Sequence, residues 1–230
     1  MRWRGESDRV ASGSPLPLWE RGLGGEGAGK MMATEQLEHW QGEFGDAYTQ
    51  RNTIDWQARL PAWQHMLDGL ALEHVVEIGC NRGHNLRALA ETGKVGGNII
   101  GIEPNQSAIE MARSSSPTYS VLHGNAFQLP FVDGYADLVF TVGVLIHIAP
   151  VDLPRALSEL YRVSRRYLLC AEYFAEDETV VEYRGHSNLL WKRDFRQAYL
   201  DQFPTLNVVR EGYWGQEYGF DRVTWWLFEK

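Results

Sequence analysis

The feature that most constrains the fold of this chain is the regular alternation of short apolar runs with stretches of helical spacing. The apolar runs occupy residues 74–78, 98–102, 119–122, 137–141 and 167–171. Because parallel strands need a long crossover connection, which is usually a helix, this alternation predicts a mainly parallel sheet with helices on both faces. Two further runs, at 206–210 and 222–228, predict an antiparallel ending. We therefore predict a doubly wound α/β fold with a seven-stranded sheet whose last strand is antiparallel.

Helices are predicted where apolar residues recur every three or four positions. Besides the segment around Leu86 and Leu89, this spacing occurs at 34–48, 55–70, 105–113, 154–163 and 193–203. Gly42 weakens the first of these helices, and Pro61 places the start of the second near Leu60. The first two helices precede the first strand, so we predict an N-terminal helical cap over residues 33–71 within one domain of residues 33–230.

Residues 1–32 differ in composition from the rest of the chain. Five glycines fall within 22–29, two prolines precede them, and no apolar periodicity emerges. We predict that this extension is disordered. It lacks the continuous apolar segment of a signal peptide. Because helical spacing begins just after Met31 and Met32, we hypothesise that translation starts at one of these two residues.

Composition and charge narrow the range of partners. The chain of 230 residues is 44% apolar and 23% charged, which allows a sizeable buried core. A formal net charge of -8 disfavours general binding to nucleic acid.

No apolar run approaches the roughly 20 residues that a membrane-spanning helix needs. Cys80 and Cys170 are too few for a disulfide framework and indicate a reducing compartment, so we expect a cytoplasmic protein. The scattered histidines and cysteines show no metal-binding spacing. The sequence leaves the oligomeric state open.

The most informative segment for function joins the first predicted strand to its helix. Glu77 ends the strand, Gly79 and Gly83 lie in the following turn, and Asn81 lies between them. Glycines allow a ligand to approach the backbone closely at such a turn. A dinucleotide-binding turn would carry a glycine in place of Asn81 and would accept a pyrophosphate. A carboxylate at Glu77 would repel a pyrophosphate and suits a ligand with an ammonium group and a sulfonium.

Two further segments follow the second and third predicted strands. Glu103 ends the second strand and is placed to accept both hydroxyl groups of a ribose, with Pro104 and Asn105 after it. Asn105 can alternatively cap the helix that follows. After the third strand, methyltransferases commonly have an aspartate that binds the adenine amino group, and by that resemblance the side-chain carbonyl of Asn125 would accept the same hydrogen bond. Phe127, which follows Ala126, can pack on the adenine ring.

Together with the segment from Leu129 through Val142 and Gly143 to His147, these motifs resemble those of class I S-adenosylmethionine-dependent methyltransferases. The resemblance implies a Rossmann-like fold and S-adenosylmethionine as cofactor. The cofactor-binding residues that it implies are Glu77, Gly79, Cys80, Asn81, Gly83, Glu103, Pro104, Asn105, Asn125, Ala126, Phe127, Val142, Gly143 and His147.

From about residue 35 to the end, the chain also resembles the pseudaminic acid biosynthesis-associated methylases. The matching residues lie in segments 40–52, 143–148, 182–186, 192–195 and 224–230. This resemblance implies a role in nonulosonic-acid and surface-glycan biosynthesis. Related folds place an N-terminal helix over the cofactor. By that resemblance, Tyr48 would cover the cofactor and Arg51 would pair with its carboxylate, or Tyr48 would belong to the core and Arg51 to a surface ion pair.

Two histidines are candidate catalytic residues. His147 follows the fourth strand, where the methyl group would be exposed, and is the first candidate for a base or an acceptor-orienting group. Alternatively, it packs at the start of the next helix. His186 lies with Tyr183 and Arg184 in the segment before the last helix, and this cluster suits an anionic sugar or carboxylate. Alternatively, it is an ordered surface loop.

Three functions remain open at the level of sequence. The first is methyl transfer to a small acceptor that is sugar-like or bears a carboxylate. The second is a cofactor-binding regulatory partner without catalysis, for which the departures at Asn81 and Asn125 leave room. The third is an NAD-dependent oxidoreductase, against which Glu77 and the missing central glycine argue.

Overall fold

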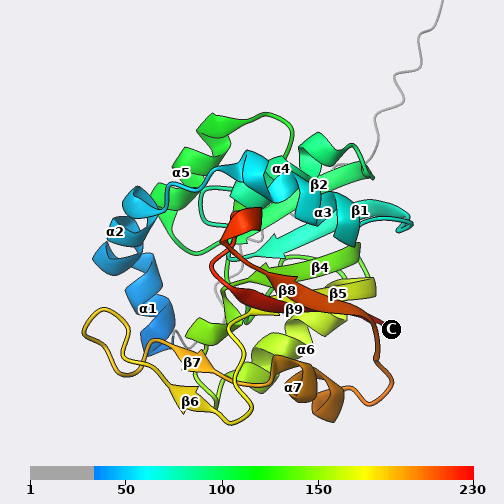
Figure 1. The fold of residues 1–230 in the computed structure, drawn as a ribbon. Coiled ribbons are helices and arrows are strands. Elements are labelled where there is room, and N and C mark those ends of the chain that lie inside the picture. The colour runs from blue at the N-terminus through cyan, green and yellow to red at the C-terminus, as the bar shows by residue number, and fades with distance from the viewer. Residues whose placement is uncertain (1–33) are drawn as a thin grey trace, which may run out of the picture. The chain divides into compact units, whose positions relative to one another are not determined.

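The structure is a computed structural model that describes residues 34–230. Its centre is a seven-stranded sheet with the order β3-β2-β1-β4-β5-β9-β8 (Figure 1). The strands are β1 (Leu72–Ile78), β2 (Val95–Glu103), β3 (Ser120–His123), β4 (Ala136–Val142), β5 (Ser164–Glu172), β8 (Asn207–Trp214) and β9 (Val223–Glu229). The first five pair in parallel, and β9 is antiparallel to both of its neighbours. The predicted fold class is confirmed.

Helices cover both faces of the sheet (Figure 1). One core contains buried residues of α3 (Leu60–Met66), α4 (His84–Thr92) and α5 (Gln106–Ser115). The opposite core contains buried residues of α6 (Leu153–Val163) and α7 (Phe195–Gln202). Central strands are therefore apolar on both faces, as a doubly wound sheet requires. In β4, six consecutive residues are buried.

The predicted helix over 34–48 is divided in two. Thr34 caps α1 (Glu35–Gln41) through its side chain, which accepts a hydrogen bond from the Leu37 N–H at 3.1 Å. Gly42 then adopts an extended conformation, which ends α1 and begins α2 (Glu43–Arg51). A side chain on Gly45 would meet the Trp40 carbonyl group and Asn105 Nδ2. The two glycines therefore permit a bend that carries α1 and α2 across the ends of the strands.

The predicted helix over 55–70 starts at Leu60, as Pro61 indicates, and is preceded by the short helix η2 (Trp56–Arg59). Two more short helices, η3 (Leu145–His147) and η4 (Gln216–Tyr218), occur in connections. The segment between β5 and α7 contains a small hairpin sheet of β6 (Thr179–Val180) and β7 (Trp191–Lys192), which the sequence analysis missed. Both strands contain only two residues, so they carry no visible periodicity.

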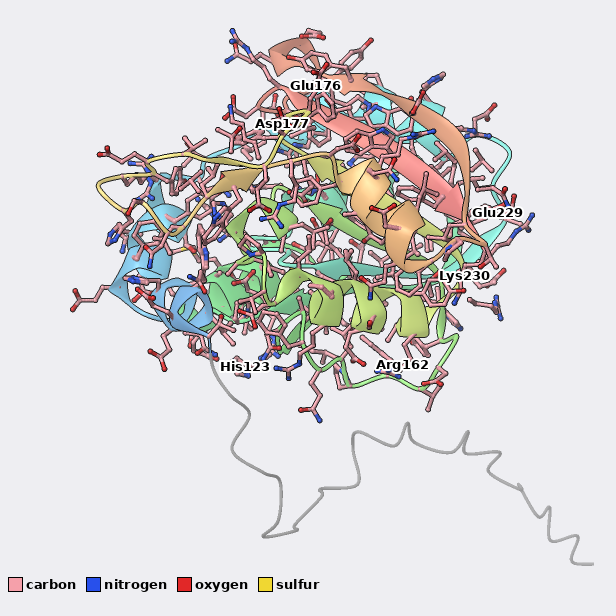
Figure 2. The ribbon with its side chains drawn as sticks, turned by 90° about the horizontal axis from the view of Figure 1, so that it is seen from below. His123, Arg162, Glu176, Asp177, Glu229 and Lys230 are labelled. Atoms are coloured by element: carbon pink, nitrogen blue, oxygen red, sulfur yellow. The ribbon has the colours of Figure 1, made fainter. Side chains whose placement is uncertain are left out.

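The chain ends beside the α6–β5 junction. Lys230 Nζ donates to the carbonyl oxygens of Tyr161 and Ser164 at 2.8 and 2.7 Å, and Figure 2 shows Lys230 next to this helix. The predicted disorder of residues 1–32 and the hypothesis on Met31 and Met32 lie outside the described residues. Within residues 34–230, no helix has the length and apolar character needed to cross a bilayer. The same residues contain no cluster of three or more His, Cys, Asp or Glu side chains placed to hold a metal ion.

Candidate functional site

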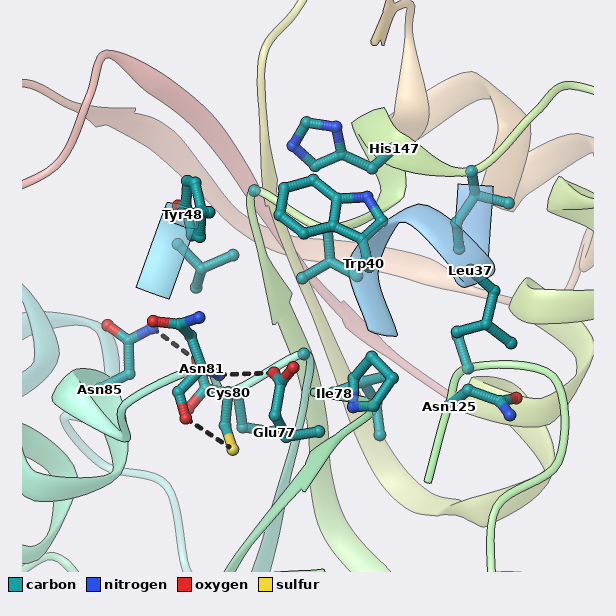
Figure 3. Close-up of a pocket in the computed structure, with 18 of the residues that line it drawn as sticks. Leu37, Trp40, Tyr48, Glu77, Ile78, Cys80, Asn81, Asn85, Asn125 and His147 are labelled. Carbon is teal, nitrogen blue, oxygen red and sulfur yellow. Dashed lines mark hydrogen bonds between the residues drawn. The ribbon is translucent and has the colours of Figure 1, made fainter. Parts of the chain in front are cut away.

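A cavity lies at the carboxyl ends of β1, β2 and β4, between these strands and α1 and α2 (Figure 3). Parallel strands that end side by side create such a crevice where the chain turns toward opposite faces of the sheet. The cavity brings together most of the cofactor-binding residues that the sequence predicts. Those that line it are Tyr48, Glu77, Gly79, Cys80, Asn81, Glu103, Pro104, Asn125, Ala126, Phe127, Val142, Gly143 and His147.

Glu77 is buried at the inner end of this cavity, with 2% of its surface exposed. Asn85 Nδ2 donates to Glu77 Oε1 at 2.6 Å. Glu77 Oε2 has no hydrogen-bond partner among the described residues. Burial raises the pKa of the Glu77 carboxyl to about 8, against the opposing effect of the Asn85 hydrogen bond. An unpaired oxygen at this depth is costly unless a ligand supplies a donor.

Glu103 shares the cavity with Glu77. Glu77 stands opposite Gly101 in the parallel ladder of β1 and β2, and Glu103 lies two residues further along β2. Because side chains alternate between faces, Glu103 lies on the same face as Glu77. Its two oxygens accept the Asn81 N–H at 2.7 Å and the Asn105 N–H at 2.9 Å. Burial raises the pKa of Glu103 to about 7, although both hydrogen bonds favour its charged form.

Asn81 fixes the turn between β1 and α4. Its backbone is left-handed, with φ of 45°, and asparagine tolerates this region better than most residues. Asn81 Nδ2 donates to Thr49 Oγ1 at 2.9 Å, and its Oδ1 accepts from Asn52 Nδ2 at 3.1 Å. The asparagine that departs from the dinucleotide pattern therefore attaches the cap helix α2 to the cavity floor.

The opposite end of the cavity is formed by the loop after β3. Asn125 Oδ1 accepts the Phe127 N–H at 2.9 Å, which stabilises a tight turn. A carbonyl oxygen has a second lone pair, so this hydrogen bond leaves one acceptor direction free. Both side chains are nearly buried. The loop therefore presents a polar edge and an aromatic ring to the same space.

His147 forms the wall near the end of β4. The His147 ring lies 4.6 Å from the Trp40 ring between centroids (Figure 3). Its Nδ1 lies 2.6 Å from the Leu189 carbonyl oxygen. Because a carbonyl group only accepts hydrogen bonds, Nδ1 carries the proton and Nε2 of the neutral ring is left as an acceptor. Burial lowers the pKa of His147 to about 4, which keeps the ring neutral at physiological pH.

The structure places three predicted cofactor-binding residues outside the cavity lining formed by the described residues. Arg51 is exposed, and its guanidinium stacks on Tyr48, 5.3 Å from the ring centroid. Gly83 is left-handed, with φ of 75°, and a Cβ there would lie 2.7 Å from Tyr119 Oη, so this glycine serves packing. Asn105 caps α5 and donates through Nδ2 to Asp46 Oδ1 at 2.9 Å. Asn105 thus fulfils the alternative role of a helix cap.

The segment around His186 is placed close to His147 but outside the cavity lining defined by residues 34–230. Tyr183 and His186 exchange backbone hydrogen bonds of 2.8 and 3.1 Å across a tight turn in which Arg184 and Gly185 have positive φ. The Tyr183 ring lies 5.4 Å from that of His147, between centroids. The His186 ring lies 5.6 Å from that of Phe44. The turn therefore closes an aromatic cluster against the cap helices.

Three residues in and around the site, Arg59, Trp40 and Glu172, are not among the site residues that the sequence predicts. Arg59 lines the cavity and is 6% exposed; its Nη1 donates to Asn85 Oδ1 at 2.6 Å. Burial lowers the pKa of Arg59 to about 10, and the Glu77 charge opposes this shift. The indole of Trp40 lines the cavity, and its buried Nε1 has no partner within the described chain. Glu172 is buried beside η3. No local sequence signal distinguishes Arg59 from Arg51, because both lie in helical segments before β1.

Solved structures of S-adenosylmethionine-dependent methyltransferases share this fold. Residues 76–167 match the family model for the methyltransferase domain. The magnesium protoporphyrin IX methyltransferase of Synechocystis PCC 6803 with bound SAH has a similar fold, with a TM-score of 0.62 at 14% identity. The similarity covers 84% of this chain and 97% of that one. The chain therefore contains an S-adenosylmethionine-dependent methyltransferase domain.

Two distant sequence relatives match parts of the chain, and one of them is a methyltransferase. A demethylmenaquinone methyltransferase of Lactiplantibacillus plantarum is 28% identical over 169 residues, covering 66% of this chain and 69% of that protein. An uncharacterised protein of transposon TN4556 from Streptomyces fradiae is 36% identical over 102 residues, which cover 43% of this chain. The matched part spans only 29% of that second relative.

Proposed function

We propose that this protein transfers the methyl group of S-adenosylmethionine to a small acceptor that is sugar-like or bears a carboxylate. The observation that carries the proposal is the buried Glu77 Oε2, which has no partner among the described residues and lines the same cavity as Glu103. An ammonium group is a donor that suits such an oxygen. S-adenosylmethionine carries an ammonium group, a sulfonium, a ribose and an adenine, and each has a matching residue here.

The proposed assignments follow the shape of the cavity. Glu77 holds the ammonium group, and Arg59, which lies near it, is better placed than Arg51 to pair with the carboxylate. Glu103 retains lone pairs beyond its two backbone hydrogen bonds, and these accept the ribose hydroxyls. Asn125 and Phe127 bind the adenine edge and face. Tyr48 and Trp40 cover the sulfonium, which the negative faces of aromatic rings attract.

The acceptor is proposed to reach the cavity beside His147. Three segments far apart in sequence contribute aromatic rings there, among them Trp40, Phe44 and Tyr183. Ring faces of this kind pack against sugar and other ring compounds, while the indole N–H of Trp40 offers a hydrogen bond. Arg51 and Arg184 stack on Tyr48 and Tyr183 at the rim, which suits an acceptor of negative charge.

The chemistry expected of these residues is mainly alignment. When bound, the cofactor supplies an electrophilic methyl group on a positively charged sulfur. The cavity residues hold that methyl group in line with the attacking atom of the acceptor, and the aromatic cap excludes water. His147 Nε2, as the free acceptor of a neutral ring, takes the proton of an attacking hydroxyl group. A carboxylate acceptor would need no such base.

We further propose a role in nonulosonic-acid or surface-glycan biosynthesis. Support comes from the resemblance to the pseudaminic acid biosynthesis-associated methylases. Segments 40–52, 143–148 and 182–186, which carry that resemblance, supply Trp40, His147 and Tyr183 to one aromatic cluster. Proteins that share an acceptor are expected to have similar residues around the acceptor entrance. The three segments that carry the resemblance meet there.

Two measurements test the proposed function. Calorimetry with S-adenosylmethionine and with NAD is expected to show binding of the first compound only. Labelled-methyl transfer is then screened against nonulosonic acids and their nucleotide-linked forms. Transfer supports catalysis, with slower turnover expected for His147→Ala at nearly unchanged cofactor affinity. Cofactor binding without transfer to any of these acceptors would favour the regulatory alternative, and failure to bind at millimolar concentration would overturn both.

A further inference from the structure

Glu172 is a buried carboxylate that the assignments above do not use. It is the last residue of β5, and its exposed fraction is 0%. Strand β5 runs parallel to β4, with Ala171 opposite Val142, and the Gly143 N–H donates to the Ala171 carbonyl oxygen at 2.9 Å. Glu172 therefore lies directly behind the cavity wall formed by Val142, Gly143 and Val144.

The carboxylate accepts hydrogen bonds from three consecutive backbone N–H groups. Its Oε1 accepts from Val144 at 3.2 Å and from Leu145 at 3.1 Å, and its Oε2 accepts from Ile146 at 3.4 Å. These N–H groups begin the short helix η3, where no preceding turn of helix offers them a carbonyl group. One side chain thus determines the backbone path from the cavity wall to His147.

We propose that Glu172 is a positioning residue that fixes His147 and the adjoining cavity wall, an inference that rests on the proposed function. His147 is the last residue of η3, and its backbone N–H donates to the Val144 carbonyl oxygen at 2.9 Å. Glu172 holds the backbone of this turn, and the Leu189 carbonyl oxygen holds the ring. Two independent attachments therefore direct Nε2 of His147.

A carboxylate suits this position better than a neutral isostere. The three backbone N–H groups that face it are donors, and a carboxylate offers only acceptors. A glutamine would turn its NH2 group toward at least one of the backbone N–H groups and leave that group unsatisfied. Burial raises the pKa of Glu172 to about 7, so the chain retains an acid here at an energetic cost. Positioning at the reaction centre explains why this cost is tolerated.

The test compares Glu172→Gln and Glu172→Asp with a matched control, Asp137→Asn. Asp137 is also a buried carboxylate that accepts two backbone N–H groups, from Glu73 and His74 at 2.8 and 2.9 Å, but at the opposite end of β4. Nuclear magnetic resonance of 15N-labelled histidine follows the titration of each ring, and His147→Ala assigns the His147 signal. Calorimetry measures the Kd for S-adenosylmethionine.

In the wild-type protein, the His147 ring is expected to stay neutral down to about pH 4. In Glu172→Gln, its titration should move upward by about one pH unit or more, because a released ring regains water. The Kd should rise about 3- to 10-fold, a change of up to about 1.4 kcal/mol. Glu172→Asp, which keeps the charge on a shorter side chain, should fall between these values. Asp137→Asn should leave both quantities at their wild-type values.

Unchanged His147 titration and Kd in folded Glu172→Gln would overturn the inference, and so would an equal change in Asp137→Asn. If Glu172→Gln does not fold, the same comparison with Glu172→Asp decides the matter. The two hypotheses fail in different ways. Absence of cofactor binding by the wild-type protein refutes the proposed function, whereas wild-type binding with an insensitive His147 refutes only the positioning role.

Discussion

Asn85 Nδ2 donates to Glu77 Oε1 at 2.6 Å and leaves the second oxygen of Glu77 facing the cavity without a partner among the described residues. Asn85 itself is held by Arg59, whose Nη1 donates to Asn85 Oδ1 at 2.6 Å. The three side chains form a chain of hydrogen bonds that fixes the free oxygen in one direction. A binding group that is oriented before the ligand arrives loses little conformational entropy on binding.

Replacement of Glu77 by glutamine should therefore weaken cofactor binding strongly. The variant keeps the size of the side chain but removes the negative charge that faces the ammonium group. A lost hydrogen bond to a charged group corresponds to about 1.5–3 kcal/mol, or roughly a 10- to 150-fold higher Kd for S-adenosylmethionine. Calorimetry measures the change, and Asp137→Asn provides the control. Wild-type affinity in Glu77→Gln would show that Glu77 has only a structural role.

Cofactor affinity should depend on pH because of the same residue. The pKa of Glu77 without ligand is about 8, so most molecules carry a proton there at pH 7. An ammonium group favours the carboxylate, which lowers this pKa and releases a proton on binding. Affinity should rise from pH 6 to pH 8 and then level off. Calorimetry in buffers of different ionisation enthalpy counts the protons released, and a flat profile in the wild-type protein would contradict the prediction.

The contribution of Glu77 to the free energy of unfolding should fall as pH rises, whereas cofactor affinity increases. The folded pKa of Glu77 lies above its ordinary value of 4.5, so the stabilising contribution of its neutral form is complete below about pH 4.5. That contribution is lost as pH rises through 8. Relative to Glu77→Gln, the apo wild-type protein should therefore lose stability between pH 5 and pH 8 in denaturant titrations, whereas saturating cofactor should reduce the loss.

Arginine substitutions distinguish two candidate partners of the cofactor carboxylate. Arg59 lies inside the cavity, where it also donates through Nε to the Gly219 carbonyl oxygen at 3.0 Å, whereas Arg51 is exposed. Arg59→Gln should raise the Kd for S-adenosylmethionine at least about 10-fold. The matched variant Arg51→Gln should raise it less than about 3-fold. The reverse order would favour Arg51 as the partner of the cofactor carboxylate, one of the two roles that the sequence leaves open for it.

Sequence spacing predicted the sheet well because its signals are local. The run that ends at Glu77 and the run that ends at Glu103 are each followed by a turn and a helix, and parallel pairing brings their ends together without further information. Contacts of the cap were harder to predict. Arg59 lines the cavity from η2, whereas Arg51, only eight positions earlier, ends α2 and is exposed.

Other parts of the site depend on contacts between distant segments, which carry no spacing signal. The pairing of His147 with Leu189 crosses 42 positions, and Glu172 reaches back 28 positions to Val144. Gly83 shows a different limit of sequence reasoning. A glycine in a turn indicates a left-handed backbone or a close approach, but the pattern does not tell whether a ligand or a side chain approaches. Here that neighbour is Tyr119.

Two glycine variants separate these roles. Gly143 and Gly83 are both left-handed, with φ of 66° and 75°, so alanine at either position incurs a similar strain of about 1 kcal/mol. A Cβ on Gly143 meets no described atom within 4 Å and would project from the cavity lining, whereas one on Gly83 collides with Tyr119. Gly143→Ala should therefore keep most of its stability but bind S-adenosylmethionine about 10-fold more weakly. Gly83→Ala should lose more stability, measured by denaturant titration, and the folded fraction should bind normally. Equal affinities for the two variants would place the cofactor away from Gly143 and from the end of β4.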